Sequence, residues 1–216
     1  MSKIKVQMFE KIAKENYKQS FVEVDLFMKK EGNLYETLKK ISKNLECLNI
    51  PFVICGAMAL NYYGRMRMTI DIDILIKGDD LRKIHENLIG RGYVQQFENS
   101  KGIRDTETGV KIDFVIAGQY PGDKKEKPIV FPDPNEIKIE KDDFGVKYIG
   151  LREFIELKLA SGMTSVTRGK DLSDVFELIK ELNLPRKFGF QLNVYVQDQF
   201  FKLWDSQEEE TGFNSM

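Results

Sequence analysis

The stretch that decides the fold reads PFVICGAMALNYYGRMRMTIDIDILI and covers residues 51–76. Its apolar start, residues 52–55, followed by Gly56, is typical of a buried strand that ends in a tight turn. Residues 57–63 have the composition of a helix of about two turns, and Gly64 ends that helix. The remaining residues alternate strictly between polar and apolar side chains, which predicts a second strand.

The second strand carries two carboxylates on one face. Thr69, Asp71 and Asp73 alternate with isoleucines, so the polar side chains point one way and the apolar ones the other. Side chains two residues apart on a strand lie about 6–7 Å from each other, close enough to bind one cation together or to hold two cations about 3.5–4 Å apart. Without a cation or a basic neighbour, the two carboxylates repel each other.

Asp113 is a third carboxylate in a similar setting. It lies in the strand-like run VKIDFVI, residues 110–116. Paired strands are about 4.8 Å apart, so Asp71, Asp73 and Asp113 would meet if their two strands were neighbours. The alternative is an ordinary salt-bridged or solvated strand face. Three acidic positions on two otherwise apolar strands favour a functional site.

These residues form an ordered motif set. A glycine with a small neighbour, a DxD pair and an acidic residue on a following strand occur here as Gly56-Ala57, Asp71-Ile72-Asp73 and Ile112-Asp113-Phe114. This set resembles that of the DNA polymerase β-like nucleotidyltransferase superfamily. Arg67 and Thr69, which precede the DxD pair, are similar to the residues found there in the bacterial stand-alone branch of the superfamily. This branch includes the AbiEii-type abortive-infection toxins. The resemblance covers residues 50–118 and extends more weakly through residues 151–182 and 192–204.

The resemblance implies a Mg²⁺- or Mn²⁺-dependent enzyme that moves a nucleoside monophosphate from an NTP to a hydroxyl group. Asp71 and Asp73 would hold the metal ions, and Asp113 would share the second ion and accept the proton of the attacking hydroxyl. The sequence leaves the acceptor open among a small molecule, a tRNA end and a protein hydroxyl. The toxin branch further implies a separate antitoxin protein as a partner.

Other residues have supporting roles in this scheme. The Gly56-Ala57 turn would hold the triphosphate through backbone N–H groups. Arg67 would support the site, and Thr69 would orient an aspartate by a hydrogen bond. Members of the superfamily often have Gly or Ser where this chain has Ala57, which has no hydroxyl to bind phosphate. The alternative function is therefore a catalytically inactive nucleotide- or partner-binding module of the same fold.

From residue 151 onward the apolar pattern has helical spacing. Lys158 falls on the same stripe as Phe154 and Ile155. A lysine there is either a boundary residue whose stem covers apolar surface, or a point charge that reaches a phosphate. The resemblance includes a lysine in this helix and so implies the second role. Asp171 and Asp174, near the start of the next helix, either suit that helix's dipole or pair with Lys158 or Arg168.

The pattern as a whole predicts an α+β protein. Residues 1–150, with a core at 33–150, would form a small mixed twisted sheet with flanking helices. Residues 151–206 would form a C-terminal helical domain and residues 207–216 a mobile tail. Residues 99–109 have the composition of a polar, hairpin-like connection into the strand that carries Asp113. The segment 118–135, rich in Pro, Gly and Lys, is either a binding loop or a solvated connection. Residues 1–32 give few signals beyond a short amphipathic helix near residues 8–13.

Composition restricts the class of protein. The 216 residues are 42% apolar and 31% charged, with a net charge of −1, which is typical of a globular domain without a global attraction to nucleic acid. Two cysteines argue against a disulfide framework, and a single histidine offers no zinc site. No apolar segment reaches about 18 residues, so we expect a cytoplasmic protein with no membrane span.

Overall fold

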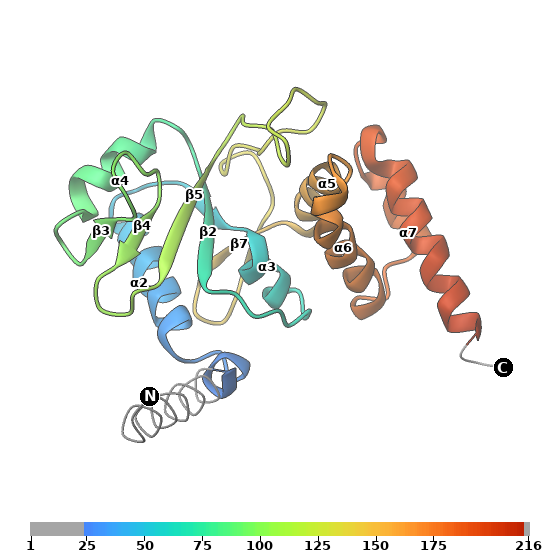
Figure 1. Ribbon diagram of the computed structural model, residues 1–216, viewed down its shortest axis with the longest axis horizontal. Helices are drawn as coiled ribbons and strands as arrows, with labels where there is room; N and C mark the ends of the chain where they lie inside the picture. Colours follow the sequence, from blue (N-terminus) through green and yellow to red (C-terminus); the bar gives the residue numbers. More distant parts are fainter. Residues whose placement is uncertain (1–23, 214–216) are drawn as a thin grey trace, which may run out of the picture.

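The computed structural model describes residues 24–213, with side chains up to residue 208. A seven-stranded mixed sheet lies at its centre (Figure 1). The order across the sheet is β3-β4-β5-β2-β1-β7-β6. The strands are β1 Phe52–Ile54, β2 Asp71–Ile76, β3 Tyr93–Gln95, β4 Ile103–Asp105, β5 Lys111–Ile116, β6 Ile139–Lys141 and β7 Lys147–Ile149. The helix predicted near residues 8–13 lies outside the described residues.

Helices flank the sheet and form the C-terminal part of the chain. They are α2 Asn33–Cys47, α3 Gly56–Tyr62, α4 Asp80–Leu88, α5 Leu151–Gly162, α6 Gly169–Glu181 and α7 Val194–Phe213, with 3-10 segments η1 Val166–Arg168 and η2 Arg186–Gln191. Figure 1 shows α5, α6 and α7 grouped together beside the sheet, at the end of the molecule away from α4 and β3. The α+β class with a helical C-terminal segment is therefore confirmed.

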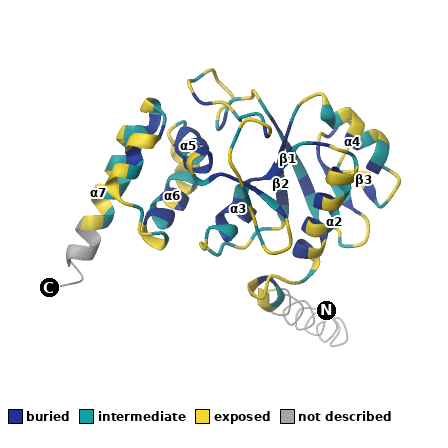
Figure 2. Cartoon of the chain, turned by 180° about the vertical axis from the view of Figure 1, so that it is seen from behind, coloured by how far each residue is buried: buried dark blue, intermediate teal, exposed yellow. Residues whose placement is uncertain are grey.

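The centre of the sheet is buried because its strands are apolar on the face covered by helices. Viewed from behind, α2 and α4 lie over the sheet, in which β1 is buried along its whole length (Figure 2). The α2 side chains Leu38, Ile41 and Leu45 are almost completely buried in this core, together with Ile72 and Ile74 of β2. The opposite face of β2 carries Asp71 and Asp73, both of them partly exposed. The two faces of this one strand thus separate core from site.

The predicted second strand begins later than its alternation indicated. Strand β2 starts at Asp71, where pairing with Lys111 of β5 begins. The preceding Ile70 is 76% exposed, so it does not belong to the core. The boundary of a strand depends on where its hydrogen-bonded neighbour begins and ends. Alternation in the sequence does not reveal this.

Two other regions contain more regular structure than the sequence indicated. Strand β4 lies within residues 99–109, where we predicted only a connection, and its Asp105 is buried against Lys40 of α2 at 2.9 Å. Helix α7 continues to Phe213, so residues 207–213 are helical. Among the described residues, no helix combines the length and the apolar character that crossing a bilayer requires.

The two faces of the Asp71 segment give a direct test of the fold. Ile72→Ala should lower the free energy of unfolding by about 2–5 kcal/mol, because Ile72 is fully buried and its loss leaves a cavity. Ile70→Ala, two residues away, should change it by less than about 0.5 kcal/mol because Ile70 is exposed. Urea unfolding of both variants measures this difference. Equal destabilisation would contradict the register of β2.

Candidate active site

Three carboxylates lie on one face of the sheet. Strands β2 and β5 are parallel neighbours in register, with Asp73 opposite Asp113 and Asp71 opposite Lys111. Residues opposite each other on paired strands point to the same face, so Asp71, Asp73 and Asp113 share it. Within the described residues, none of the three has a lysine, arginine or histidine nitrogen within 4 Å. Their mutual repulsion is not relieved by a protein cation in contact.

The donor set fits a hard divalent cation. Carboxylate oxygens are the ligands that Mg²⁺ and Mn²⁺ prefer. The described part of the chain contains no group of three His, Cys, Asp or Glu side chains already spaced to hold a metal ion. The aspartates provide suitable atoms and charge without a preformed cage. Such a site would be completed by the phosphates of a bound nucleotide, which commonly share Mg²⁺ with one or two carboxylates.

Thr69 holds one of the aspartates in place. Its hydroxyl donates to Asp71 Oδ1 at 2.5 Å. The residue lies just before β2, so the contact is made from the turn that enters the strand. The hydrogen bond that we predicted from Thr69 to an aspartate is present in the structure.

Asp73 is the most constrained of the three carboxylates. Burial, followed by the charges of Asp71 and Asp113, raises the pKa of Asp73 to about 6, although Lys158 and Arg67 act in the opposite direction. Next to it, Gly56 has φ +60, and a Cβ added there would lie 1.8 Å from Asp73 Oδ2. Only glycine allows the turn before α3 to approach this carboxylate so closely.

A cavity of about 310 Å³ opens over this face of the sheet. Its volume falls within the range of small-ligand sites. The sheet side is lined by the predicted residues Gly56, Ala57, Arg67, Thr69, Asp71 and Asp73. The opposite wall comes from α5, η1 and α6 and includes Lys158, Ser161, Arg168 and Asp171. Asp113 is not among the lining residues, so it lies beside the cavity, on the β4 side of Asp73.

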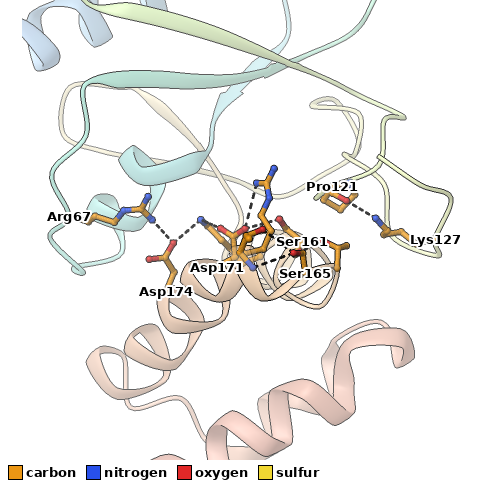
Figure 3. A network of polar contacts seen from close by, with 11 residues as sticks. Arg67, Pro121, Lys127, Ser161, Ser165, Asp171 and Asp174 are labelled. Carbon is orange, nitrogen blue, oxygen red and sulfur yellow. Dashed lines mark hydrogen bonds and ion pairs between the residues drawn. The ribbon is translucent and has the colours of Figure 1, made fainter. Parts of the chain in front are cut away.

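A network of polar contacts in the cavity wall includes Arg67, Ser161, Asp171 and Asp174, which Figure 3 labels. Lys158 is part of the same network. Its Nζ atom lies 2.7 Å from Asp171 Oδ1 and 2.8 Å from Asp174 Oδ2, and its side chain is only 12% exposed. Arg67 donates to the same Asp174 oxygen at 2.5 Å. Asp171 also accepts a hydrogen bond from Ser161 at 2.7 Å. The pairing of Asp171 and Asp174 with a cation, rather than the helix dipole alone, explains their position.

Arg67 links the sheet to the C-terminal helices. Its backbone N–H donates to Asn61 Oδ1 of α3, while its guanidinium pairs with Asp174 of α6. Its Nε atom is buried and has no hydrogen-bond partner among the residues that the structure describes.

The segment after β5 forms the third wall. Pro121, Gly122 and Phe131 line the cavity. The ammonium group of Lys127 donates to Pro121 O and to Asp123 Oδ1, each at 2.6 Å, and its side chain is 5% exposed. This segment is therefore part of the cavity and not merely a solvated connection. The composition of the segment indicated a loop but could not predict that the buried side chain of Lys127 orders it.

Several residues at the site were missed from the sequence. Ser161 lines the cavity but belongs to no motif of the resemblance. The sequence indicated Arg168 and Asp171, which also line the cavity, only as members of an ion pair, and Asp171 lies 2.7 Å from Lys158 and 4.0 Å from Arg168. Gln96 donates to Asp113 Oδ1 at 2.8 Å from the β3–β4 turn. Seventeen residues separate Gln96 from Asp113, so no local pattern could have indicated the contact.

The raised pKa of Asp73 predicts a pH-dependent stability in metal-free protein. In the unfolded chain the carboxyl group has a pKa of about 3.9. Between about pH 4 and pH 6 the folded state binds this proton more tightly, so ionisation lowers the free energy of unfolding as the pH rises through that window. Asp73→Asn has no carboxyl group to ionise at this position, so its stability should not fall in this window. Its free energy of unfolding should match that of wild type near pH 4 and exceed it at pH 7.5 by at most about 3 kcal/mol.

Chemical denaturation in a chelator across this pH range measures the difference. Asp123→Asn is the control, because the hydrogen bond from Lys127 lowers the pKa of Asp123. Its loss should therefore destabilise the protein more at neutral pH than at low pH. If the free energy of unfolding of Asp73→Asn changed with pH in parallel with that of wild type, a raised pKa of Asp73 would be contradicted.

Comparison with known proteins gives similarity at the level of solved structures. No protein-family model matches the chain. No curated protein matches it. The antibiotic-resistance factor ANT(2'')-Ia aligns over 83% of this chain and 95% of its own at 14% identity and a TM-score of 0.44. A Thermotoga maritima protein assigned to the nucleotidyltransferases aligns over 67% and 92% at 16% identity and a TM-score of 0.46. The lincosamide antibiotic adenylyltransferase LnuA, solved with lincomycin, aligns over 66% and 93% at 16% identity and a TM-score of 0.41. These scores are all below 0.5, so the case for a function rests on the side chains described above.

Proposed function

We propose that this protein is a Mg²⁺-dependent nucleotidyltransferase that moves a nucleoside monophosphate from an NTP to a hydroxyl group of an acceptor. The observation that carries the proposal is the register of β2 and β5, which places Asp71, Asp73 and Asp113 on one face of the sheet next to a cavity. A structural role does not account for three carboxylates that have no cationic partner in the described part of the chain. Their need for a divalent cation does.

The roles of the aspartates follow from their positions. Asp71 and Asp73 line the cavity and would hold Mg²⁺, or Mn²⁺ in its place, with Asp113 as a shared ligand of a second ion. When bound, the ions neutralise negative charge on the phosphates of the NTP. Asp113 lies beside the cavity and would accept the proton of the acceptor hydroxyl. That oxygen forms a bond to the α-phosphorus, the bond from the α-phosphorus to the β-phosphate oxygen breaks, and pyrophosphate leaves.

The remaining cavity residues would bind and orient the nucleotide. Gly56 and Ala57 are the first two residues of α3. Their backbone N–H groups therefore have no carbonyl acceptor within the helix. They would donate to phosphate oxygens. Lys158 on the opposite wall and Arg67 on the sheet side would supply positive charge, and both are held in fixed positions by ion pairs with Asp171 or Asp174.

A toxin role, with a separate antitoxin as partner, is a further part of the proposal and concerns biology more than chemistry. The motif likeness to AbiEii-type toxins supports it. Expression of the chain should then slow growth, and co-expression of the product of a neighbouring gene should restore it. A cytoplasmic location, in which NTP and Mg²⁺ are available, agrees with this role.

The direct test is incubation of the protein with each α-³²P-labelled NTP, Mg²⁺ or Mn²⁺ and a cell lysate. Label in the small-molecule, RNA or protein fraction would identify the acceptor class and the preferred nucleotide. The same incubation with Asp71→Asn protein should leave all fractions unlabelled. Wild-type protein that binds NTP but labels no fraction would favour the inactive binding module.

Nucleotide binding should depend on the Asp71–Asp73 pair. In calorimetry with a non-hydrolysable NTP and Mg²⁺, the variant Asp71→Asn with Asp73→Asn should lose binding, because both carboxylates line the cavity. The matched control is Asp79→Asn with Asp80→Asn, which removes two neighbouring carboxylates at the start of α4. The control should bind as wild type does. Equal nucleotide affinity in the two double variants would contradict a metal site at Asp71 and Asp73.

Asp113→Asn should separate transfer from binding. Asp113 does not line the cavity, so nucleotide affinity should change little. The rate of transfer should fall by about 100-fold or more, about 3 kcal/mol, because a ligand and proton acceptor of the transition state is lost. Calorimetry and the labelling rate on the same protein measure both quantities. A rate within a few-fold of wild type would exclude Asp113 from the reaction.

A further inference from the structure

We propose that Gln96 is a positioning residue for Asp113 and that Gly102 provides the space that this contact needs. The inference deepens the proposed function, on which its catalytic part rests. Gln96 follows β3 directly, and its amide reaches across the end of β4 to β5. It is the hydrogen-bond donor that the structure gives to the Asp113 carboxylate, with Nε2 at 2.8 Å from Oδ1.

The orientation of the Gln96 amide is fixed by its surroundings. Besides Asp113 Oδ1, the Nε2 atom faces Ile112 O at 3.2 Å and Ile103 O at 3.4 Å. A carboxylate oxygen and two carbonyl oxygens can only accept hydrogen bonds. The NH₂ group must therefore face all three. The amide is held by the backbone of two paired strands, which keeps the donor in a constant position next to Asp113.

Gly102 makes this arrangement sterically possible. A Cβ added at this position would lie 2.4 Å from Gln96 Nε2, 2.7 Å from Asp113 Oδ1 and 2.8 Å from Ile112 O. The backbone of Gly102 is not in the left-handed region, so conformational freedom does not explain the glycine. The absence of a side chain does, because the Gln96 amide, the Asp113 carboxylate and the carbonyl oxygen of Ile112 occupy that space.

Asp71 and Asp113 each accept a hydrogen bond from an uncharged side chain. Thr69 donates a neutral hydrogen bond to Asp71, and Gln96 donates one to Asp113. A neutral donor fixes a carboxylate's orientation without cancelling the charge that a divalent cation requires. A lysine or arginine in the same place would supply that charge itself. Gln96 therefore aims Asp113 and leaves its charge available to the site.

The first measurement uses ¹⁵N NMR of the full chain and needs no activity. Gln96→Met identifies the side-chain amide signals of Gln96. Asp113→Asn should move those signals more than those of any other glutamine, because the charged acceptor is lost. Gln95 is the matched control: it is the adjacent glutamine, and its amide donates to Ser100 O at 3.3 Å. Gln96 signals that stay in place would overturn the proposal.

The second measurement is kinetic. Gln96→Met keeps the length of the side chain but removes the donor, and it should lower kcat about 10-fold to 100-fold with the KM for NTP unchanged within about twofold. Gly102→Ala should have the same effect, and Gln95→Met should have none. The double variant Gln96→Met with Asp113→Asn should be no slower than Asp113→Asn alone, because Gln96 acts through Asp113.

Each outcome is decisive. A fully active Gln96→Met, or a double variant slowed by the product of the two single effects, would overturn the positioning role. Wild-type protein without transfer to any acceptor would refute the proposed function instead. In that case the NMR result alone decides whether Gln96 positions Asp113. Circular dichroism of every variant excludes loss of fold as the cause.

Discussion

Electrostatic repulsion among Asp71, Asp73 and Asp113 is the constraint on which the rest of the site depends. The parallel pairing of β2 and β5 forces Asp73 next to Asp113, and the alternation of β2 adds Asp71 on the same face. The fold bears this cost because Ile72, Ile74 and Ile76 on the other face of β2 are fully buried. The buried face of β2 thus offsets the repulsion between the carboxylates on its other face and Asp113 of β5.

The positive groups around the site are arranged so that they do not neutralise these aspartates. Lys158 and Arg67 are close enough to lower the pKa of Asp73, yet their ion pairs are with Asp171 and Asp174. Cation and anion therefore alternate across the cavity, from the sheet to α5 and α6. In the proposed function, the aspartates would attract the metal ions, and Lys158 and Arg67 would attract the phosphate groups.

The parts of the fold and site that could be predicted are those written in local patterns. The strand alternation around Asp71, and the run around Asp113, indicated two strands and one face. The structure adds that these strands are neighbours and in register. The pairing of Lys158 with Asp171 and Asp174 stayed one of two alternatives, because helical spacing cannot tell a boundary lysine from a buried one. Gln96 could not be found at all, since its contact depends on how the β3–β4 turn folds over β5. Ile70 shows the converse error, in which a correct alternation extends beyond the end of the strand pairing.

The network of Lys158, Asp171, Asp174 and Arg67 also bears on how the cavity responds to salt. Mobile ions screen exposed charges over a Debye length of about 8 Å at physiological ionic strength, but they act far less on pairs that water barely reaches. Lys158 and Asp174 are 12% and 8% exposed, whereas the surface pair Lys29–Asp25 is 60% and 63% exposed. Surface pairs of that kind weaken as the salt concentration rises. The spacing between the sheet and the C-terminal helices would then stay constant over ionic strengths that abolish ordinary surface ion pairs.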